Sequence, residues 1–385
     1  MKKRILYVAT VDMFTPSGGA FATKAYYQAF CNIFPNIVDL MHAEEYYRFL
    51  SLENQGNIIL QKRKPWYIRL YYFLLGHTHR FYPDVIQYLR DNKSLYSHCI
   101  INGSTYAGDL IKEVQKMGVK VFVIHHNYEY DFHKDNKTIY CYKGLYMGGI
   151  TKMERNAFLE SDLNIFLTKN DLNTLHENYG TPKSKSIYIG CFDYKKEEVQ
   201  TPISNSYNNT LVISGALDFY QSEHGILSFI EQIYSKYIKE NTNVRLIITG
   251  RNPTTKIREV AHKYSDNIIL YENPKDIYEI IKKGCIYLCP ISIGSGIKLR
   301  IMDGLKLGMP ILAHTNSHFG YEEFIEKPYF KLYSDYNSFK EELLKIIILY
   351  TNNQIIPSEI QADFSSVFGL KAGINRIIQN LVIEQ

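Results

Sequence analysis

Short apolar runs alternate with segments of helical periodicity along most of the chain. In the first half, the pattern predicts buried strands at residues 5–9, 98–102, 119–124, 163–168 and 187–189, with helices at 20–34, 106–118 and 154–160. A sequence that alternates strands with helices in this way predicts a parallel sheet with helices on its faces.

The alternation restarts after a polar stretch at residues 192–209, which is rich in turn formers and predicts a linker between two domains. Beyond it we expect strands at 210–214, 244–249, 268–271, 285–290 and 310–313, and helices at 225–239, 255–264, 274–283 and 297–307. The chain is therefore expected to be an α/β protein with doubly wound domains at residues 1–195 and 205–360. An amphipathic helix at 369–382 follows them.

Charge and cysteine content narrow the class of protein. The formal net charge is +5, which is low for a nucleic-acid-binding protein but suits one that meets phosphates or an anionic membrane. The six cysteines form no CxxC pair, so they predict reduced core residues and no metal site. The first residues lack a signal-peptide pattern and no apolar run reaches about 18 residues, so we expect a cytoplasmic protein without a membrane span.

The segment 285–312 carries the strongest chemical signal. A buried strand ends at Pro290, and Gly294, Ser295 and Gly296 follow as a loop that opens a predicted helix. Glycine lets a backbone approach a ligand closely, and the free N–H groups at a helix start favour a phosphate. An ordinary strand–loop–helix unit with a solvated basic face is the alternative, because a single glycine motif is weak evidence.

Three charged residues follow this loop. Lys298 and Arg300 lie just inside the predicted helix and add positive charge. Asp303 comes seven residues after Gly296, on nearly the same helix face and roughly 10 Å further along. A pyrophosphate at the loop and ribose hydroxyls at Asp303 would fit that spacing.

The first domain offers two more candidate regions. His125 and His126 follow a strand, where open parallel sheets bind ligands, and Glu129 is expected to position this loop. The alternatives are a turn histidine bonded to backbone and a solvated carboxylate. Residues 61–82 combine a basic cluster with Trp66 and several tyrosines, which predicts an interfacial membrane helix; a core helix with a basic lead-in is the alternative.

Taken together, these motifs resemble the family 4 glycosyltransferases. Pro290, the Gly-Ser-Gly loop, the basic positions, Asp303 and a final Gly-Met-Pro at 308–310 follow the C-terminal signature of that family. Further matches occur in the same order at Gly18 and Gly19, 125–129, 154–162, 167–171, 213–220 and 246–253. The resemblance covers about residues 5–325.

The resemblance implies the GT-B fold, in which two Rossmann-like doubly wound domains face each other across a central cleft, with a last helix at about 365–385 crossing back to the first domain. It implies retaining transfer of a sugar from a nucleotide-diphosphate donor, with a UDP-sugar favoured and with no metal or other cofactor. The acceptor would be a glycan or a lipid-linked molecule in the synthesis of a surface polysaccharide or glycoconjugate. Residues 61–82 would then rest on the inner membrane face, and no nucleic acid is expected as a partner.

Residues that match the family motifs receive roles from the resemblance. The catalytic residues would be His126 near the donor sugar, Lys298 near the diphosphate and Asp303 at the ribose. The donor-binding residues would be Gly18, Gly19, Gly215, Arg251, Gly294, Ser295, Gly296 and Arg300, and the acceptor side would hold His125 and Glu129.

Two positions depart from the family pattern. Ser295 stands where many members have a glutamate, and Asp303 replaces a second glutamate with a shorter side chain. A non-catalytic GT-B subunit that binds a glycan or a partner enzyme therefore stays open as an alternative. A nucleotide-sugar epimerase, which shares the fold, is disfavoured because the sequence offers fewer clustered carboxylates and histidines.

Overall fold

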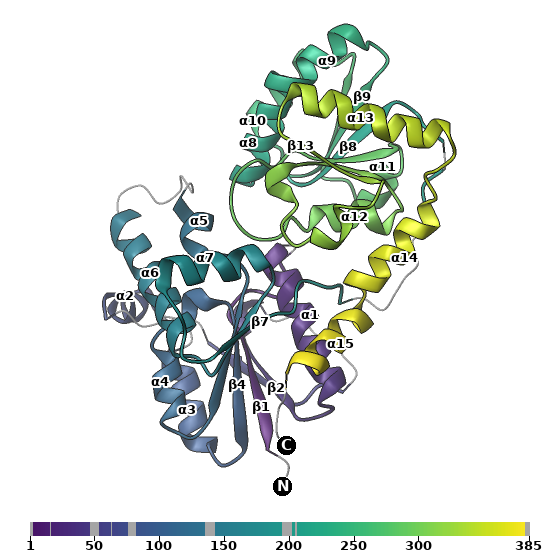
Figure 1. The fold of residues 1–385 in the computed structure, drawn as a ribbon. Coiled ribbons are helices and arrows are strands. Elements are labelled where there is room, and N and C mark those ends of the chain that lie inside the picture. The colour runs from purple at the N-terminus through teal and green to yellow at the C-terminus, as the bar shows by residue number, and fades with distance from the viewer. Residues whose placement is uncertain are drawn as a thin grey trace. The chain divides into compact units, whose positions relative to one another are not determined.

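The computed structural model describes residues 3–15, 17–46, 54–62, 64–75, 82–134, 143–194, 202–204 and 206–381. The chain forms two compact units (Figure 1): unit 1 is Met1–Glu197 with Phe368–Gln385, and unit 2 is Glu198–Val367. The division falls within the predicted linker, of which residues 195–201 and 205 lie outside the described part. No helix in the described ranges is long and apolar enough to cross a membrane.

A seven-stranded parallel sheet forms the centre of unit 1, in the order β3-β2-β1-β4-β5-β6-β7. Its strands are β1 (Arg4–Ala9), β2 (Val38–Ala43), β3 (Ile58–Gln61), β4 (Tyr96–Asn102), β5 (Lys120–His125), β6 (Leu163–Phe166) and β7 (Lys185–Tyr188). The apolar pattern predicts five of them. It misses β2, which buries the polar Asp39 and His42, and the short edge strand β3.

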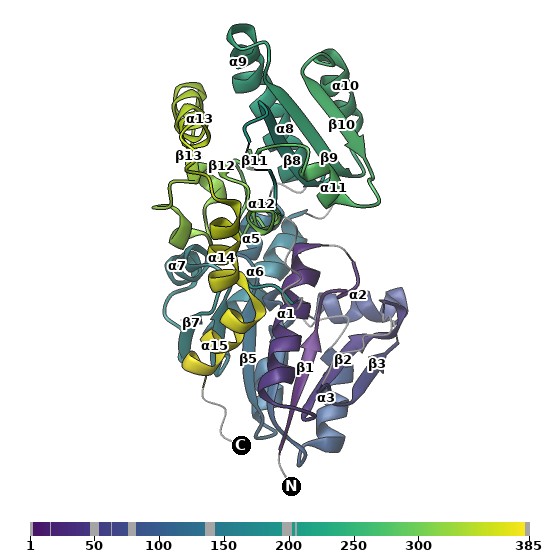
Figure 2. The same cartoon turned by 90° about the vertical axis from the view of Figure 1, so that its right-hand side faces the viewer.

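Helices pack on both faces of this sheet (Figure 2). They are α1 (Gly18–Ile33), α2 (Trp66–Leu74), α3 (Tyr82–Asn92), α4 (Leu110–Gln115), α5 (Glu129–Lys134), α6 (Lys143–Glu160), α7 (Lys169–Tyr179) and α15 (Leu370–Asn380). Because alternate strand residues point to opposite faces, Ile5 and Tyr7 pack in a cluster with α1 and α15, and Leu6 and Val8 in one with α3 and α4.

The final helix belongs to unit 1, although it follows unit 2 in the sequence. Arg376 on α15 donates from Nε to the carbonyl oxygen of Ile189 at 2.6 Å, just beyond β7. Phe192 packs so closely on Gly373 that a Cβ atom there would lie 2.2 Å from the ring. The end of the predicted helix, at residue 382 and beyond, lies outside the described residues.

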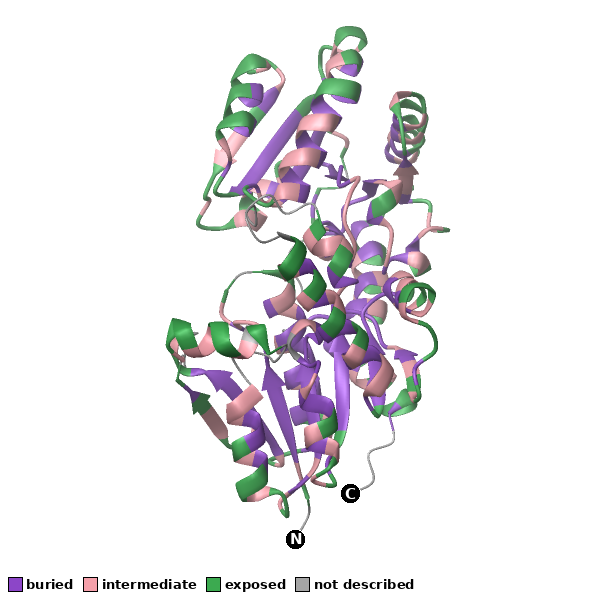
Figure 3. Cartoon of the chain, turned by 90° about the vertical axis from the view of Figure 1, so that its left-hand side faces the viewer, coloured by how far each residue is buried: buried purple, intermediate pink, exposed green. Residues whose placement is uncertain are grey.

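Unit 2 contains a six-stranded parallel sheet in the order β10-β9-β8-β11-β12-β13, whose strands are largely buried (Figure 3). The strands are β8 (Thr210–Ala216), β9 (Arg245–Arg251), β10 (Ile268–Glu272), β11 (Ile286–Cys289), β12 (Ile311–His314) and β13 (Phe330–Tyr333). The helices are α8 (Tyr220–Phe229), α9 (Ser235–Glu240), α10 (Thr255–Lys263), α11 (Ile277–Ile281), α12 (Arg300–Lys306), α13 (Tyr336–Thr351) and α14 (Pro357–Phe368). All strands but β13 match predicted runs.

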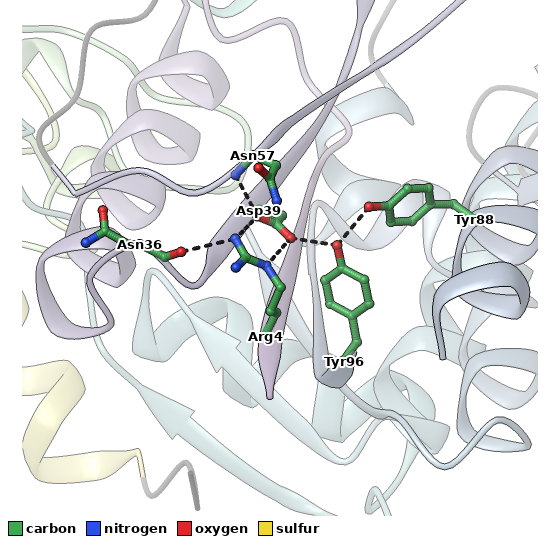
Figure 4. Close-up of polar contacts among 6 residues, drawn as sticks. All are labelled: Arg4, Asn36, Asp39, Asn57, Tyr88 and Tyr96. Carbon is green, nitrogen blue, oxygen red and sulfur yellow. Dashed lines mark hydrogen bonds and ion pairs between the residues drawn. The ribbon is translucent and has the colours of Figure 1, made fainter. Parts of the chain in front are cut away.

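A buried ion pair ties together the amino ends of β1, β2 and β4, at the edge of the sheet opposite to the one that binds ligands in this class of fold (Figure 4). The carboxylate of Asp39 has no exposed area and pairs with the guanidinium of Arg4. It also accepts hydrogen bonds from the Tyr96 hydroxyl and the Asn57 backbone N–H, both at 2.6 Å. The cluster therefore fixes three strands in register and has a structural role.

We expect Arg4→Met to lower the free energy of unfolding of unit 1 by about 3 kcal/mol, because it leaves the buried Asp39 carboxylate without its cation. Methionine keeps most of the apolar stem, so packing changes little. Chemical denaturation measures the effect. Lys116→Ala, which breaks the exposed Lys116–Glu113 pair, is the matched control and should leave the curve unchanged. Equal curves for all three proteins would contradict the prediction.

Candidate functional site

The glycine loop of unit 2 is shaped from inside by Lys298. Only 7% of Lys298 is exposed, and its Nζ donates to the carbonyl oxygens of Gly294, Ser295 and Gly296 at 3.0, 2.8 and 3.0 Å. Both glycines have positive φ values, 84° and 75°, which residues with a side chain rarely adopt. The family resemblance implies that Lys298 lies near the diphosphate. In the structure its ammonium group bonds to the loop itself, and a role beside the diphosphate stays a prediction.

The helix after the loop begins later than predicted. The pattern predicts a helix at 297–307, whereas α12 begins at Arg300 and its N-cap is Leu299. The side chain of Lys298 turns back to the loop, and the backbone that carries it forms a turn in which Ile301 N donates to Lys298 O at 3.0 Å. Gly296 is therefore separated from the helix start by three residues, Ile297 to Leu299.

Arg300 is the cation that faces the carboxyl end of β8. Its guanidinium lies over Gly215, where a Cβ atom would come within 3.0 Å of Arg300 Cζ. Nη2 donates to Ser222 Oγ at 2.5 Å, and the buried Nη1 has no hydrogen-bond partner among the described residues. Gly215 and Arg300, both predicted to bind the donor, thus lie side by side, with a buried N–H group that is still available to an anion.

Helix α8 brings two further polar side chains, Gln221 and Ser222, next to Arg300 and the glycine loop. Neither is predicted from the sequence. Gln221 packs on the loop, so that a Cβ atom at Gly294 would lie 1.9 Å from its Nε2. Ser222 orients Arg300. Both are buried in the first turn of α8, directly after the loop that follows β8. Their place after a strand and glycine loop is the signal that could have identified them.

Asp303 lies on α12 and is half-buried. Its Oδ1 accepts a hydrogen bond from the hydroxyl of Tyr278 on α11 at 3.0 Å, which orients the carboxylate. Arg251 ends β9 with an exposed side chain. The Asn252 side chain donates to Asp218 Oδ2 at 3.1 Å, and its backbone N–H donates to Asn273 Oδ1 at 2.9 Å. These bonds join the loops after β8, β9 and β10.

In unit 1, the structure brings His126 next to the two glycines that begin α1, Gly18 and Gly19. A Cβ atom at Gly19 would lie 3.6 Å from His126 Nδ1, so the two are in contact, and Gly18 is the first residue of α1. Burial lowers the pKa of His126 to about 4, although Glu129 acts in the opposite direction. The imidazole is therefore neutral at pH 7. Its buried Nε2 has no partner among the described residues.

Two buried carboxylates hold the loop that carries His126. Asp171 Oδ1 accepts from the backbone N–H of Tyr128 at 3.1 Å, and Glu154 Oε1 accepts from that of Glu129 at 2.9 Å. Burial, followed by the charge of Glu129, raises the pKa of Glu154. Both carboxylates lie in segments that match the family motifs. Their contacts give them a positioning role.

His125 and Glu129 do not have the surroundings expected of acceptor-side residues. His125 ends β5 and is completely buried; its ring stacks on Phe166 at 4.6 Å and Nε2 bonds to Asn164 Oδ1 at 2.8 Å. His125 is the last residue of β5 and packs among aromatic side chains of the core, whereas His126 lies next to Gly19. Glu129 is also buried and lies 3.3 Å from His133 Nε2. These contacts give His125 a structural role, and the acceptor-side roles stay predictions.

No group of three potential metal ligands occurs among the residues that the structure describes. Because this search covers only those residues, the expected metal independence stays a prediction.

Comparison with known proteins supports the sequence resemblance. Residues 208–347 match the family model of glycosyl transferases group 1. A Klebsiella pneumoniae protein, described as an uncharacterized 44.6 kDa protein in the cps region, is 27% identical over 114 residues, which are 28% of this chain and 29% of that protein. The chain thus matches well under two thirds of this relative's length.

Solved structures extend the likeness to both units. Anabaena Alr3699/HepE in complex with UDP is 12% identical, with a TM-score of 0.63 over 98% of this chain and 99% of that chain. WaaG, a glycosyltransferase involved in lipopolysaccharide biosynthesis, is 12% identical, with a TM-score of 0.66 over 98% and 100%. The predicted family resemblance and the GT-B fold class with two Rossmann-like domains are confirmed. At these identities the structures show the fold alone.

Proposed function

We propose that the chain is a retaining glycosyltransferase that takes its sugar from a nucleoside diphosphate donor bound in unit 2. The observation that carries the proposal is Arg300, whose guanidinium lies beside Gly215 with a buried, unpartnered Nη1. A diphosphate oxygen would satisfy that N–H with a charge-assisted hydrogen bond. The group 1 match of this unit supports the proposal, as does HepE, which was solved with UDP and with UDP-glucose. A UDP-sugar is therefore the favoured donor.

Each residue of the donor site has a separate part in the proposed transfer. Negative charge develops on the diphosphate as its bond to the sugar breaks, and a fixed cation stabilises that charge. Arg300 would supply this cation, while Lys298 keeps the glycine loop in shape. Asp303, oriented by Tyr278, would accept a hydrogen bond from a ribose hydroxyl.

The remaining steps are proposed from the family resemblance. His126, as a neutral imidazole, would hydrogen-bond to the transferred sugar rather than carry charge. The leaving phosphate would accept the proton of the acceptor hydroxyl, so the reaction would need neither a metal nor a protein base. Asp171 and Glu154 would keep the His126 loop in place.

We propose a glycan or lipid-linked acceptor, in the synthesis of a surface polysaccharide or glycoconjugate in the cytoplasm. Two relatives support this choice: the Klebsiella protein from a cps region and WaaG, which is involved in lipopolysaccharide biosynthesis.

Calorimetric titration with UDP, GDP and dTDP tests the donor site. We expect one nucleotide, UDP by preference, to bind tightly, and Asp303→Ala to weaken it at least tenfold, or about 1.4 kcal/mol, because the ribose loses an acceptor. Glu279→Ala removes an exposed carboxylate from the neighbouring α11 and should change nothing. If the folded protein binds none of the three, the transferase proposal is wrong and a non-catalytic subunit takes its place.

A further inference from the structure

The exposed apolar surface of the described residues is concentrated in one short segment. Of the fifteen large hydrophobic side chains that are exposed, seven lie between residues 60 and 75. Five of these seven lie on the nine-residue helix α2, where Trp66 and Leu74 are each 73% exposed. Outside this segment, the exposed residues are scattered over both units, singly except for Leu344 and Ile348 on α13, which is normal for a protein surface. Only α2 therefore presents a continuous apolar surface within this part of the chain.

The exposed side chains of α2 are apolar and lie on one side of the helix. The exposed positions are Trp66, Tyr67, Leu70, Tyr71 and Leu74, whose spacing of one, three, one and three residues places them on one side of a helix. Ile68 and Tyr72, which lie on the other side of the helix, are only half-exposed. A surface helix of a globular protein normally presents polar side chains to solvent, whereas the exposed side of α2 is apolar.

The charge of the same segment indicates a lipid surface rather than another protein as the partner. Residues 60–75 contain four basic residues, Lys62, Arg63, Lys64 and Arg69, and no acidic ones. Lys62 is exposed, while Lys64 pairs with Asp84 at 2.9 Å. Lysine is depleted in protein–protein interfaces, whereas Lys and Arg beside Trp, Tyr and Leu are typical of a helix that lies in the headgroup region of an anionic bilayer.

We propose that α2 docks the protein on the surface of an anionic lipid bilayer. Trp66, Tyr67 and Tyr71 would lie at headgroup depth, and Leu70 and Leu74 would reach the acyl boundary. Lys62 would lie against the lipid phosphates. This goes beyond the proposed function, because it does not depend on sugar transfer; where the acceptor is lipid-linked, it also accounts for how the enzyme meets it.

The single tryptophan of the chain lies in this surface, so its fluorescence reports on α2 alone. The experiment adds vesicles of phosphatidylcholine, with or without phosphatidylglycerol, and follows Trp66 emission and co-sedimentation. With anionic vesicles we expect binding, a blue shift of the emission and quenching by brominated acyl chains. Neutral vesicles should bind at least tenfold more weakly.

Variants distinguish binding through α2 from nonspecific hydrophobic binding of the protein to vesicles. Leu70→Ser with Leu74→Ser should weaken vesicle binding at least tenfold, and Lys62→Glu should weaken it about fivefold or more. The control is Leu344→Ser with Ile348→Ser, which removes two comparably exposed apolar side chains from α13 and should leave binding unchanged. All these positions are exposed, so folding is preserved.

The proposal is overturned if the wild-type protein binds neither kind of vesicle, or if the Leu70/Leu74 variant binds as the wild type does. It is also overturned if a blue shift appears without vesicles as the protein concentration rises, since α2 would then pack against a second copy of the chain. Nucleotide titration measures the donor site of unit 2, whereas vesicle binding measures α2. A protein that binds no vesicles can therefore still be a glycosyltransferase, and a protein that binds no nucleotide can still dock on a bilayer.

Discussion

Replacing Arg300 by methionine is expected to lower kcat/KM for the sugar donor by roughly 100- to 1,000-fold. Arg300 is positioned over Gly215 by Ser222, and its buried Nη1 has no other partner among the described residues. Loss of this fixed cation removes stabilisation from the leaving diphosphate, so the effect falls on the transition state more than on substrate binding. Initial-rate measurement of nucleoside diphosphate release gives the ratio.

Two further variants make this result specific. Arg300→Lys keeps the charge but loses the planar guanidinium group, which can bond to Ser222 and to a diphosphate oxygen at once. We therefore expect this variant to keep only part of the activity. Arg258→Met removes an exposed arginine that pairs with Glu272 on the same unit and should leave the rates unchanged. An Arg300→Met protein with wild-type kcat/KM would show that another group neutralises the diphosphate.

Replacing Lys298 by methionine is expected to destabilise unit 2 by about 3 kcal/mol even when no nucleotide is present, and to abolish nucleotide binding. The ammonium group makes three hydrogen bonds to loop carbonyls in a nearly buried position. Without it, those oxygens lose their partner and the loop loses the shape that Gly294 and Gly296 permit. Thermal unfolding of the unliganded protein measures the first effect, and calorimetry the second.

The unliganded measurement decides between two roles for this lysine. A lysine that acts only on the ligand would matter only when the ligand is present; the family resemblance implies such a place near the diphosphate for Lys298. If Lys298→Met unfolds like the wild type but binds nucleotide weakly, the loop-holding role is wrong and direct phosphate contact is restored. Lys306→Met, at the end of α12, tests whether loss of any lysine near this helix has the same effect.

The parts of the fold that the sequence predicts are those with uniform apolar strands. Strands such as β1, β5 and β9 are buried on both faces and read as continuous apolar runs. The pattern fails at β2, where Asp39 is buried because Arg4 and Tyr96, distant in sequence, neutralise and bond to it. Such a partner set exists only in the folded chain.

In the candidate site, too, local features can be predicted from the sequence, whereas contacts that depend on the folded chain cannot. Residue type and order identify Gly215, Gly294, Gly296 and Arg300, because a glycine loop and a cation after a strand are local features. The direction in which a side chain points cannot be predicted from the neighbouring sequence. Lys298 turns inward to its own loop, and His125 enters the core one residue before His126, which only the backbone path and the packing decide.

Proton NMR of the purified protein with UDP-sugars, recorded before the released sugar can mutarotate, is the most direct test of sugar transfer by this chain. We expect slow release of UDP, liberated sugar with the anomeric configuration it had in the donor, and release by Arg300→Met that is roughly 100- to 1,000-fold slower. An inverted product would contradict the retaining mechanism. Donors that stay intact with a folded protein that binds no nucleotide would contradict the assignment as a glycosyltransferase.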